Sequence, residues 1–194
     1  MQTTSVVLVG VGGQGILLAS EIVAQAAVAA GFDVKTNEVH GMAQRGGSVV
    51  AQIRFGEKVY SPLVPKGTAA VLGSLERMEV LRYTDYLAPD GLAVVSNQRI
   101  IPVSASTGPV GYPDITEELL KSHFARLIYL DVVAEAESLG NPKAANTILL
   151  GAMSNQIDLP KSAWETAIRG SVKEKFVDLN LKAFEIGRKM KADN

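Results

Sequence analysis

The chain alternates short, almost wholly apolar runs with longer stretches of helical periodicity, and this alternation predicts an α/β protein with a mostly parallel sheet. Strands are expected at residues 6–9, 32–39, 68–73, 92–96 and 126–130. Helices are expected at residues 16–30, 75–83, 116–123, 131–139, 143–157, 162–168 and 173–191, and Ser74 is expected to cap the second of them. The first strand, helix and strand make a β-α-β unit, so we expect a Rossmann-like fold with a helical C-terminal part.

Two stretches depart from a plain Rossmann half. Residues 48–55 and 58–61 flank Gly56 and Glu57 and predict a β-hairpin inserted before the next parallel strand. Farther on, Ile100, Ile101 and Val103 form a possible short strand, and residues 104–113 form a loop rich in turn residues. Loops of this length in compact domains are usually functional or mobile, and this one suits either ligand binding or contact with a partner.

Composition narrows the class of protein. With 194 residues, 47% of them hydrophobic, the chain suits a single domain over residues 1–194. A formal net charge of -1 gives no electrostatic case for binding nucleic acid or a membrane. The chain has no cysteine, so it can hold neither a disulfide nor a thiolate-bound iron–sulfur cluster. No leader and no membrane-spanning run is evident, and we expect a cytoplasmic protein.

The first candidate site is the turn between the first strand and the first helix. Gly10, Gly12 and Gly15 have the spacing of a dinucleotide fingerprint, and Gly13 and Gln14 lie between them. A helix N-terminus at this turn would offer free N–H groups and a positive dipole end to a phosphate or carboxylate. The alternative is that the glycines only permit a tight turn.

A second glycine segment follows the second strand. Arg45 stands beside Gly46 and Gly47, and a guanidinium next to two glycines could contact an anion. Glu38 is placed where a dinucleotide site holds a ribose hydroxyl. His40 is one of only two histidines, so we predict no metal site and a structural or interface role for it.

The helices at residues 16–30 and 143–157 are apolar around most of their circumference, which indicates burial on more than one side. Gly151, in the middle of the second, costs about 1 kcal/mol relative to alanine, and a close contact with another helix or subunit would offset that cost. Homodimer contacts through these helices are therefore one expectation.

The assembled motifs resemble a known family over nearly the whole chain. Residues 10–16, residues 40–48, the strand at 68–73 and the Asn146 to Gly151 stretch are similar to the gamma domain of 2-oxoacid:ferredoxin oxidoreductases. Within that family, the chain length, Arg45 and the Gly111-Tyr112-Pro113 loop most resemble the beta subunit of indolepyruvate ferredoxin oxidoreductases.

The resemblance implies that a 2-oxoacid, coenzyme A and oxidised ferredoxin give an acyl-CoA, carbon dioxide and reduced ferredoxin. Thiamine diphosphate with Mg and iron–sulfur clusters would do this chemistry. This chain lacks cysteine and shows no thiamine motif, so the resemblance places these cofactors on a large alpha subunit, which meets ferredoxin in the complex. This chain is then a subunit that is not active alone.

By the same resemblance, the two glycine segments could hold a phosphate or the pantetheine arm of coenzyme A. No catalytic residue is assigned, and the binding candidates are Gly10, Gly12, Gly13, Gln14, Gly15, Arg45, Gly46 and Gly47. The competing interpretation is that both segments pack against the partner. Two other functions stay open, an NAD-dependent dehydrogenase suggested by the fingerprint and Glu38, and a scaffolding module without a ligand.

Overall fold

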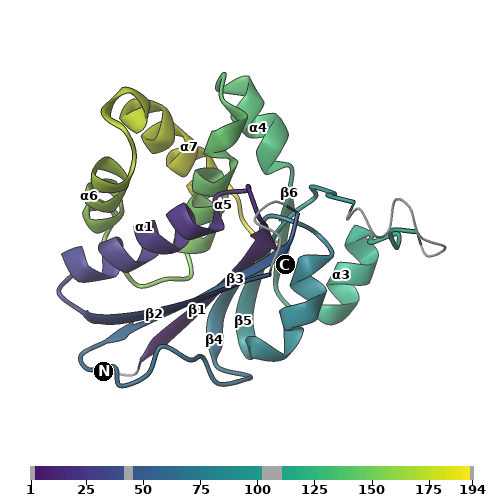
Figure 1. Cartoon of the computed structure of the whole chain (residues 1–194), viewed down its shortest axis with the longest axis horizontal. Coiled ribbons are helices and arrows are strands. Elements are labelled where there is room, and N and C mark those ends of the chain that lie inside the picture. Colours follow the sequence, from purple (N-terminus) through teal and green to yellow (C-terminus); the bar gives the residue numbers. More distant parts are fainter. Residues whose placement is uncertain (1–2, 42–45, 102–110, 193–194) are drawn as a thin grey trace.

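A computed structural model describes residues 3–41, 46–101 and 111–192. Within these ranges the chain forms one six-stranded sheet in the order β2-β3-β1-β4-β5-β6 (Figure 1). The strands are β1 (Thr4–Val11), β2 (Asp33–His40), β3 (Ser48–Gly56), β4 (Ala69–Ser74), β5 (Leu87–Ser96) and β6 (Leu127–Leu130). β1, β4, β5 and β6 are parallel, whereas β3 is antiparallel to both of its neighbours. The α/β class and the mostly parallel sheet are confirmed.

Helices cover both faces of the sheet. One face carries α1 (Ile16–Ala29), α4 (Val132–Ser138), α5 (Ala145–Ser154), α6 (Lys161–Ser171) and α7 (Val177–Lys189), and α1 and α5 lie across the strands in Figure 1. Short 3-10 turns, η2 (Pro142–Ala144) and η3 (Glu174–Phe176), lead into α5 and α7. The other face carries η1 (Glu79–Tyr86) and α3 (Glu117–His123). The helical C-terminal part therefore forms the outer layer of the first face.

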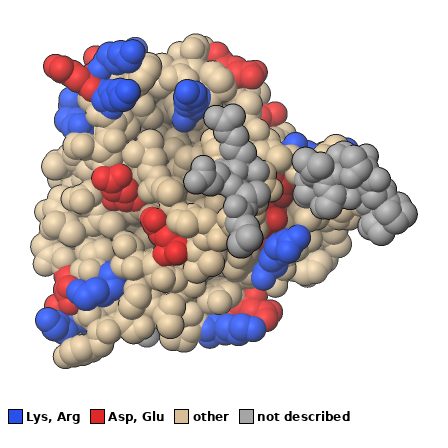
Figure 2. All heavy atoms as spheres, in the orientation of Figure 1, with Lys and Arg blue, Asp and Glu red and all other residues tan. Residues whose placement is uncertain are grey.

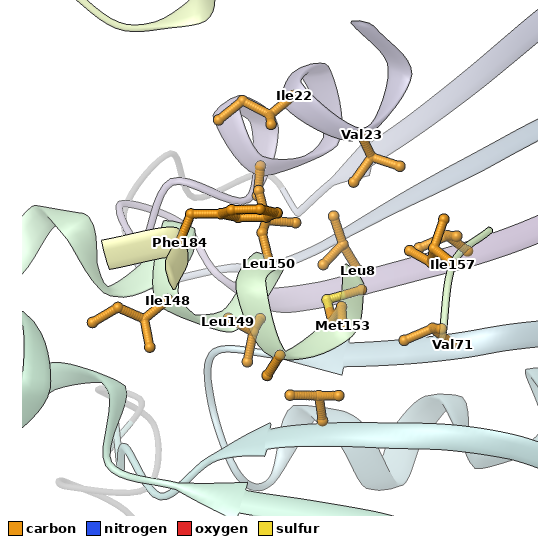
Figure 3. Close-up of a cluster of buried hydrophobic side chains, with 14 of the residues drawn as sticks. Leu8, Ile22, Val23, Val71, Ile148, Leu149, Leu150, Met153, Ile157 and Phe184 are labelled. Atoms are coloured by element: carbon orange, nitrogen blue, oxygen red, sulfur yellow. The ribbon is translucent and has the colours of Figure 1, made fainter. Parts of the chain in front are cut away.

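Alternate residues of the strands feed two separate hydrophobic clusters, as the period of a strand requires. In β1, Val6 and Leu8 join the cluster under α1 and α5, whereas Val7 and Val9 join the one under η1 and α3. Figure 3 shows Leu8 of β1 close to Met153 of α5, with Ile22 and Val23 of α1 above them and Val71 of β4 below. The expected burial of α1 on two sides is confirmed, because α1 lies between the sheet and α6.

A β-hairpin forms, but it joins β2 and β3 and not residues 48–55 and 58–61. The antiparallel partner of β3 is β2, with His40 opposite Val49 and Asp33 opposite Gly56. Residues 58–61 form no strand, because β1 and β2 already occupy both edges of β3. This strap is instead held by side chains, since Asp33 accepts from the N–H of Val59 (2.9 Å). The prediction of a 48–55/58–61 hairpin was wrong, and β3 also separates β2 from β1 within the expected β-α-β unit.

A second expectation also fails after β4. Residues 75–83 are not a helix capped by Ser74, since the helical segment is η1 and begins four residues later, at Glu79. The Ser74 hydroxyl donates to the carbonyl of Glu76 (2.6 Å), and the Glu76 carboxylate takes the N–H groups of Met78 (2.7 Å) and Glu79 (2.9 Å). Glu76 thus does the capping expected of Ser74.

The segment after β5 is only partly described. Ile100 and Ile101 form no strand, and residues 102–110, which include Val103 and most of the expected long loop, lie outside the described residues. The start of α3 is confirmed, because the Thr116 hydroxyl accepts from the N–H of Leu119 (3.2 Å).

Candidate functional site

The turn between β1 and α1 lies at the carboxyl end of the parallel strands, where open α/β sheets bind ligands. Gly15 is the N-cap of α1 with a left-handed φ of 83°, and Gly13 has a φ of 103°. Residues with a side chain rarely adopt such angles. Gly10 is needed for a different reason, because a Cβ there would lie 2.8 Å from Oε1 of Gln14 and 2.9 Å from Cδ1 of Ile16.

The second glycine segment lies directly against the first. The N–H of Gly12 donates to the carbonyl of Gly47 (2.8 Å), and the N–H of Gly46 donates to the carbonyl of Gly12 (3.4 Å). The structure therefore brings together the two glycine segments that the sequence singled out. These bonds occupy the N–H of Gly12, which the fingerprint would give to a phosphate, and Arg45 lies outside the described residues.

Gln14 has all of its side-chain polar atoms bound within the chain. Its amide nitrogen donates to the carbonyl of Leu75 and to Oε1 of Gln98, and its oxygen accepts from the N–H of Val11, each at 2.7 Å. Gln14 therefore ties the carboxyl ends of β1, β4 and β5 together.

This position of Gln14 bears on the dehydrogenase alternative. The chain leaves β1 to form α1 on one face and leaves β4 to form η1 on the other, so the switch point of the sheet lies between β1 and β4. A dinucleotide would bind in the crevice there, but the Gln14 side chain spans from β1 to Leu75, just after β4. Glu38, the expected ribose ligand, instead accepts from the Ser20 hydroxyl of α1 (2.6 Å).

The amide side chain of Asn146 also supports the glycine turn, by binding to Gly15. Nδ2 of Asn146, in the first turn of α5, donates to the carbonyl of Gly15 (3.1 Å). The next residue, Thr147, donates to Asn180 of α7 (2.7 Å), which in turn donates to the carbonyl of Phe176 (2.9 Å). Asn146, Thr147 and Asn180 are all at least 92% buried, so the first helix turn is braced by a buried polar chain.

A hollow of about 800 Å³ opens beside this turn. It is lined by Val11, Gly12, Gly13, Gly15, Ile16, Leu17, Leu18, His40, Gly41 and Val49. No side chain of the described residues caps α1, and the first-turn N–H groups of an α-helix have no partner within the helix. The hollow therefore combines apolar walls with hydrogen-bond donors and the positive end of a helix dipole. An anionic group attached to an apolar arm fits this combination.

The redox and thiamine groups implied by the resemblance do not fit this chain. An iron–sulfur cluster needs thiolates, and the sequence contains no cysteine. Over the described ranges, no group of three or more His, Asp or Glu side chains could hold a metal ion such as the one that accompanies thiamine diphosphate.

The bracing residues were not predicted from the sequence. Gln14 was expected to touch a ligand, and Asn146 was named only as the start of a stretch that resembles the family. The sequence nevertheless held a signal for Asn146, because an amide side chain in the first turn of a buried helix needs a hydrogen-bond partner. His40 is exposed and lines the hollow. The structural or interface role that the sequence indicated for it stays a prediction.

The face of the molecule that carries α1 shows no large patch of one charge. Lys and Arg side chains alternate with Asp and Glu around its rim, and most of its centre is uncharged (Figure 2). In the described part of the chain, no helix is long and apolar enough to cross a membrane.

Comparison with known proteins shows the family. The model of the pyruvate ferredoxin/flavodoxin oxidoreductase family matches residues 5–190. Indolepyruvate oxidoreductase subunit IorB of Thermococcus kodakarensis is 41% identical over 97% of this chain and 96% of its own, and IorB of Archaeoglobus fulgidus is 42% identical over 94% and 92%. The fold is similar to that of a keto/oxoacid ferredoxin oxidoreductase gamma subunit from Geobacter sulfurreducens, with a TM-score of 0.70 and 24% identity over 96% of each chain. These matches do not favour the NAD-dependent dehydrogenase, and the chain belongs to the pyruvate ferredoxin/flavodoxin oxidoreductase family.

Proposed function

We propose that this chain is the small subunit of an indolepyruvate ferredoxin oxidoreductase, which converts a 2-oxoacid and coenzyme A into an acyl-CoA and carbon dioxide while reducing ferredoxin. The similarity to two IorB subunits at 41% and 42% identity, over nearly the full length of each chain, carries this proposal. The lack of cysteine supports placing the iron–sulfur clusters, and with them thiamine diphosphate and Mg, on a larger partner subunit.

Reconstitution tests this assignment. The large subunit of the same enzyme is expected to reduce ferredoxin with indolepyruvate and coenzyme A only after this chain is added. Rates with pyruvate, ketoisovalerate and 2-oxoglutarate, measured in parallel, decide the substrate. Full activity of the large subunit without this chain would contradict the proposal.

We further propose that the glycine turn and its hollow bind coenzyme A. A phosphate would lie at the N-terminus of α1, where N–H groups and the dipole favour negative charge, near Gly13 and Gly15. The apolar side chains of Ile16, Leu17 and Val49 would line the pantetheine arm, because they form the walls of the same hollow. Arg45 would add charge from the neighbouring segment, and the role of Gln14, Gly10, Gly46 and Gly47 would be to hold the turn in shape.

Leu17→Glu separates ligand binding from folding. Leu17 is 44% exposed in the first turn of α1, where an acidic residue favours the helix but repels a phosphate. Coenzyme A at 100 times its Kd is expected to stabilise the wild-type chain by about 2.7 kcal/mol, and Leu17→Glu is expected to abolish the rise in melting temperature. Leu17→Gln, similar in size but neutral, is the control and is expected to keep most of it. An equal rise in all three proteins would refute binding at this turn, while the subunit assignment would stand.

A further inference from the structure

Two arginines flank one tyrosine at the carboxyl edge of the sheet. Arg77 follows β4 and Arg99 follows β5, and the N–H of Arg77 donates to the carbonyl of Gln98 (3.1 Å), which joins the two segments. The guanidinium carbons of Arg99 and Arg77 lie 4.6 Å and 5.7 Å from the ring centre of Tyr112. We call Arg77, Arg99, Tyr112 and the adjoining Ile101 the arginine–tyrosine patch.

The patch carries two guanidinium groups, and Glu76, the carboxylate next to it in the described part of the chain, is bound to the Tyr112 hydroxyl and to neither arginine. Neither guanidinium forms an ion pair there, whereas nearby Arg82 pairs with Glu79 (3.3 Å). The buried Glu76 accepts from Tyr112, from the N–H of Ile100 and from two N–H groups of the η1 turn, so its oxygens are already engaged. Nε of Arg77 is itself buried without a hydrogen-bond partner. Two neighbouring guanidiniums that lack an ion pair repel each other, and an incoming anion would reduce that repulsion.

The tyrosine of the patch is fixed by a buried carboxylate. The Tyr112 hydroxyl donates to Oε1 of Glu76 (2.5 Å), and Glu76 is only 1% exposed. The ring is thus a fixed platform, with the exposed Arg99 lying on it. Ile101, two positions after Arg99 in the chain, is 46% exposed and is one of few large apolar side chains at the surface of the described residues. Arginine and tyrosine are enriched among the few residues that supply most of the binding energy of a protein–protein interface. The patch has this composition.

We propose that the arginine–tyrosine patch docks an acidic segment of the larger partner chain. This inference depends on the proposed function, because it takes the partner from it. The carboxylates of the segment would pair with Arg99 and Arg77, and an apolar side chain beside them would cover Ile101. Gln98 links the patch to the glycine turn through its bond with Gln14 (2.7 Å), so a partner seated here would also lie along the edge that carries the candidate coenzyme A site.

Charge reversal at the exposed arginine tests the proposal. The Kd between this chain and the large subunit of the same enzyme is measured by biolayer interferometry at low and high salt. Arg99→Glu is expected to raise Kd by about tenfold or more at low salt, because it sets like charges against each other, and Arg99→Lys is expected to fall between Arg99→Glu and wild type. High salt should weaken the wild-type complex more than that of Arg99→Glu.

Lys189→Glu is the matched control, with the same change of charge. Lys189 is exposed on α7, and the neighbouring Met190 lines a hollow with Arg126, which precedes the amino end of β6, away from the carboxyl edge of the sheet. Its Kd is expected to stay within about twofold of wild type. Equal Kd values for wild type and Arg99→Glu would overturn the docking proposal alone. Failure of the wild-type chain to bind the large subunit would overturn both this proposal and the proposed function.

Discussion

At the scale of single residues, the site is shaped by side chains that bind the protein's own backbone. Gln14 illustrates this, because each of its three hydrogen bonds joins a different segment at the carboxyl edge. A buried donor or acceptor that loses its partner costs about 1–3 kcal/mol. Gln14, which lies between the two glycines proposed to meet the ligand, is thus a residue on which the stability of the turn depends.

Gln14→Ala is expected to lower the free energy of unfolding by about 2–3 kcal/mol, because it leaves the N–H of Val11 and the carbonyl of Leu75 without their partner. Urea denaturation measures the change. Gln25→Ala, an exposed position on the same helix, is the control and is expected to change stability by less than about 0.5 kcal/mol. Similar effects at the two positions would show that the hydrogen bonds of Gln14 do not support the turn.

Tyr112 gives a prediction with a pH dependence. Burial, followed by the hydrogen bond to the Glu76 carboxylate, raises the pKa of Tyr112 above its ordinary value of 10.0. The folded state therefore holds this proton more tightly than the unfolded state, so the stabilisation is complete below about pH 10 and is lost as the pH rises toward the raised pKa. Tyr112→Phe is expected to cost about 1.5–3 kcal/mol at neutral pH. Urea midpoints of the two proteins should converge above pH 10, and a constant difference would contradict this explanation.

At the scale of elements, the backbones of α5 and α7 approach each other closely where the two helices cross. A Cβ on Gly151 would meet the carbonyl oxygen of Phe184, and one on Gly187 would meet the carbonyl oxygen of Ile148. The close helix contact expected from Gly151 is therefore made within the chain, by α7. The structure therefore explains why position 151 is a glycine without any contact with a second subunit.

Gly151→Ala is expected to destabilise the protein by about 3 kcal/mol, because the added methyl group meets backbone that cannot move aside. Gly170→Ala in α6 is the matched control, since nothing lies within 4 Å of its Cβ position. That variant should gain about 0.5–1 kcal/mol from helix propensity. Thermal denaturation of the two variants measures the expected loss of stability for Gly151→Ala and the expected gain for Gly170→Ala. A Gly151→Ala protein as stable as wild type would contradict the described crossing.

Elements set by local pattern could be predicted from the sequence, and those set by long-range pairing could not. Val6 to Val9 are all fully buried, and this apolar run correctly indicated the central strand. The pairing of β3 with β2 depends on which strand edge is free in the folded sheet, and no local pattern records that. The same limit applies to the site. The glycines of the turn could be read from their spacing, whereas the bond from Asn146 to Gly15 joins residues far apart in the sequence.

At the scale of the whole molecule, the sheet and its two helical layers present a turn, a hollow and a positively charged patch along one edge. Relatives of this chain are subunits of indolepyruvate oxidoreductases, which implies that it works with a partner subunit. In the proposed complex this chain supplies binding surface, while electron transfer takes place elsewhere.

The isolated chain, purified under anaerobic conditions with iron and sulfide, is expected to show no visible absorption from an iron–sulfur cluster, because it has no thiolate to hold one. The reconstituted complex should show that absorption in full. The large subunit prepared alone is the control and should carry the same amount of iron per chain. A cluster on the isolated small chain would refute the proposed division of labour.

The bond between Asn146 and the carbonyl of Gly15 spans 131 positions of sequence. During synthesis, the glycine turn is translated well before its brace, which follows 131 positions later in the chain. The helix that begins at Ile16 must therefore wait for a much later part of the nascent chain before its first turn is fixed. A stalled or prematurely terminated product that ends before Asn146 would carry every glycine of the motif and still lack a finished binding turn.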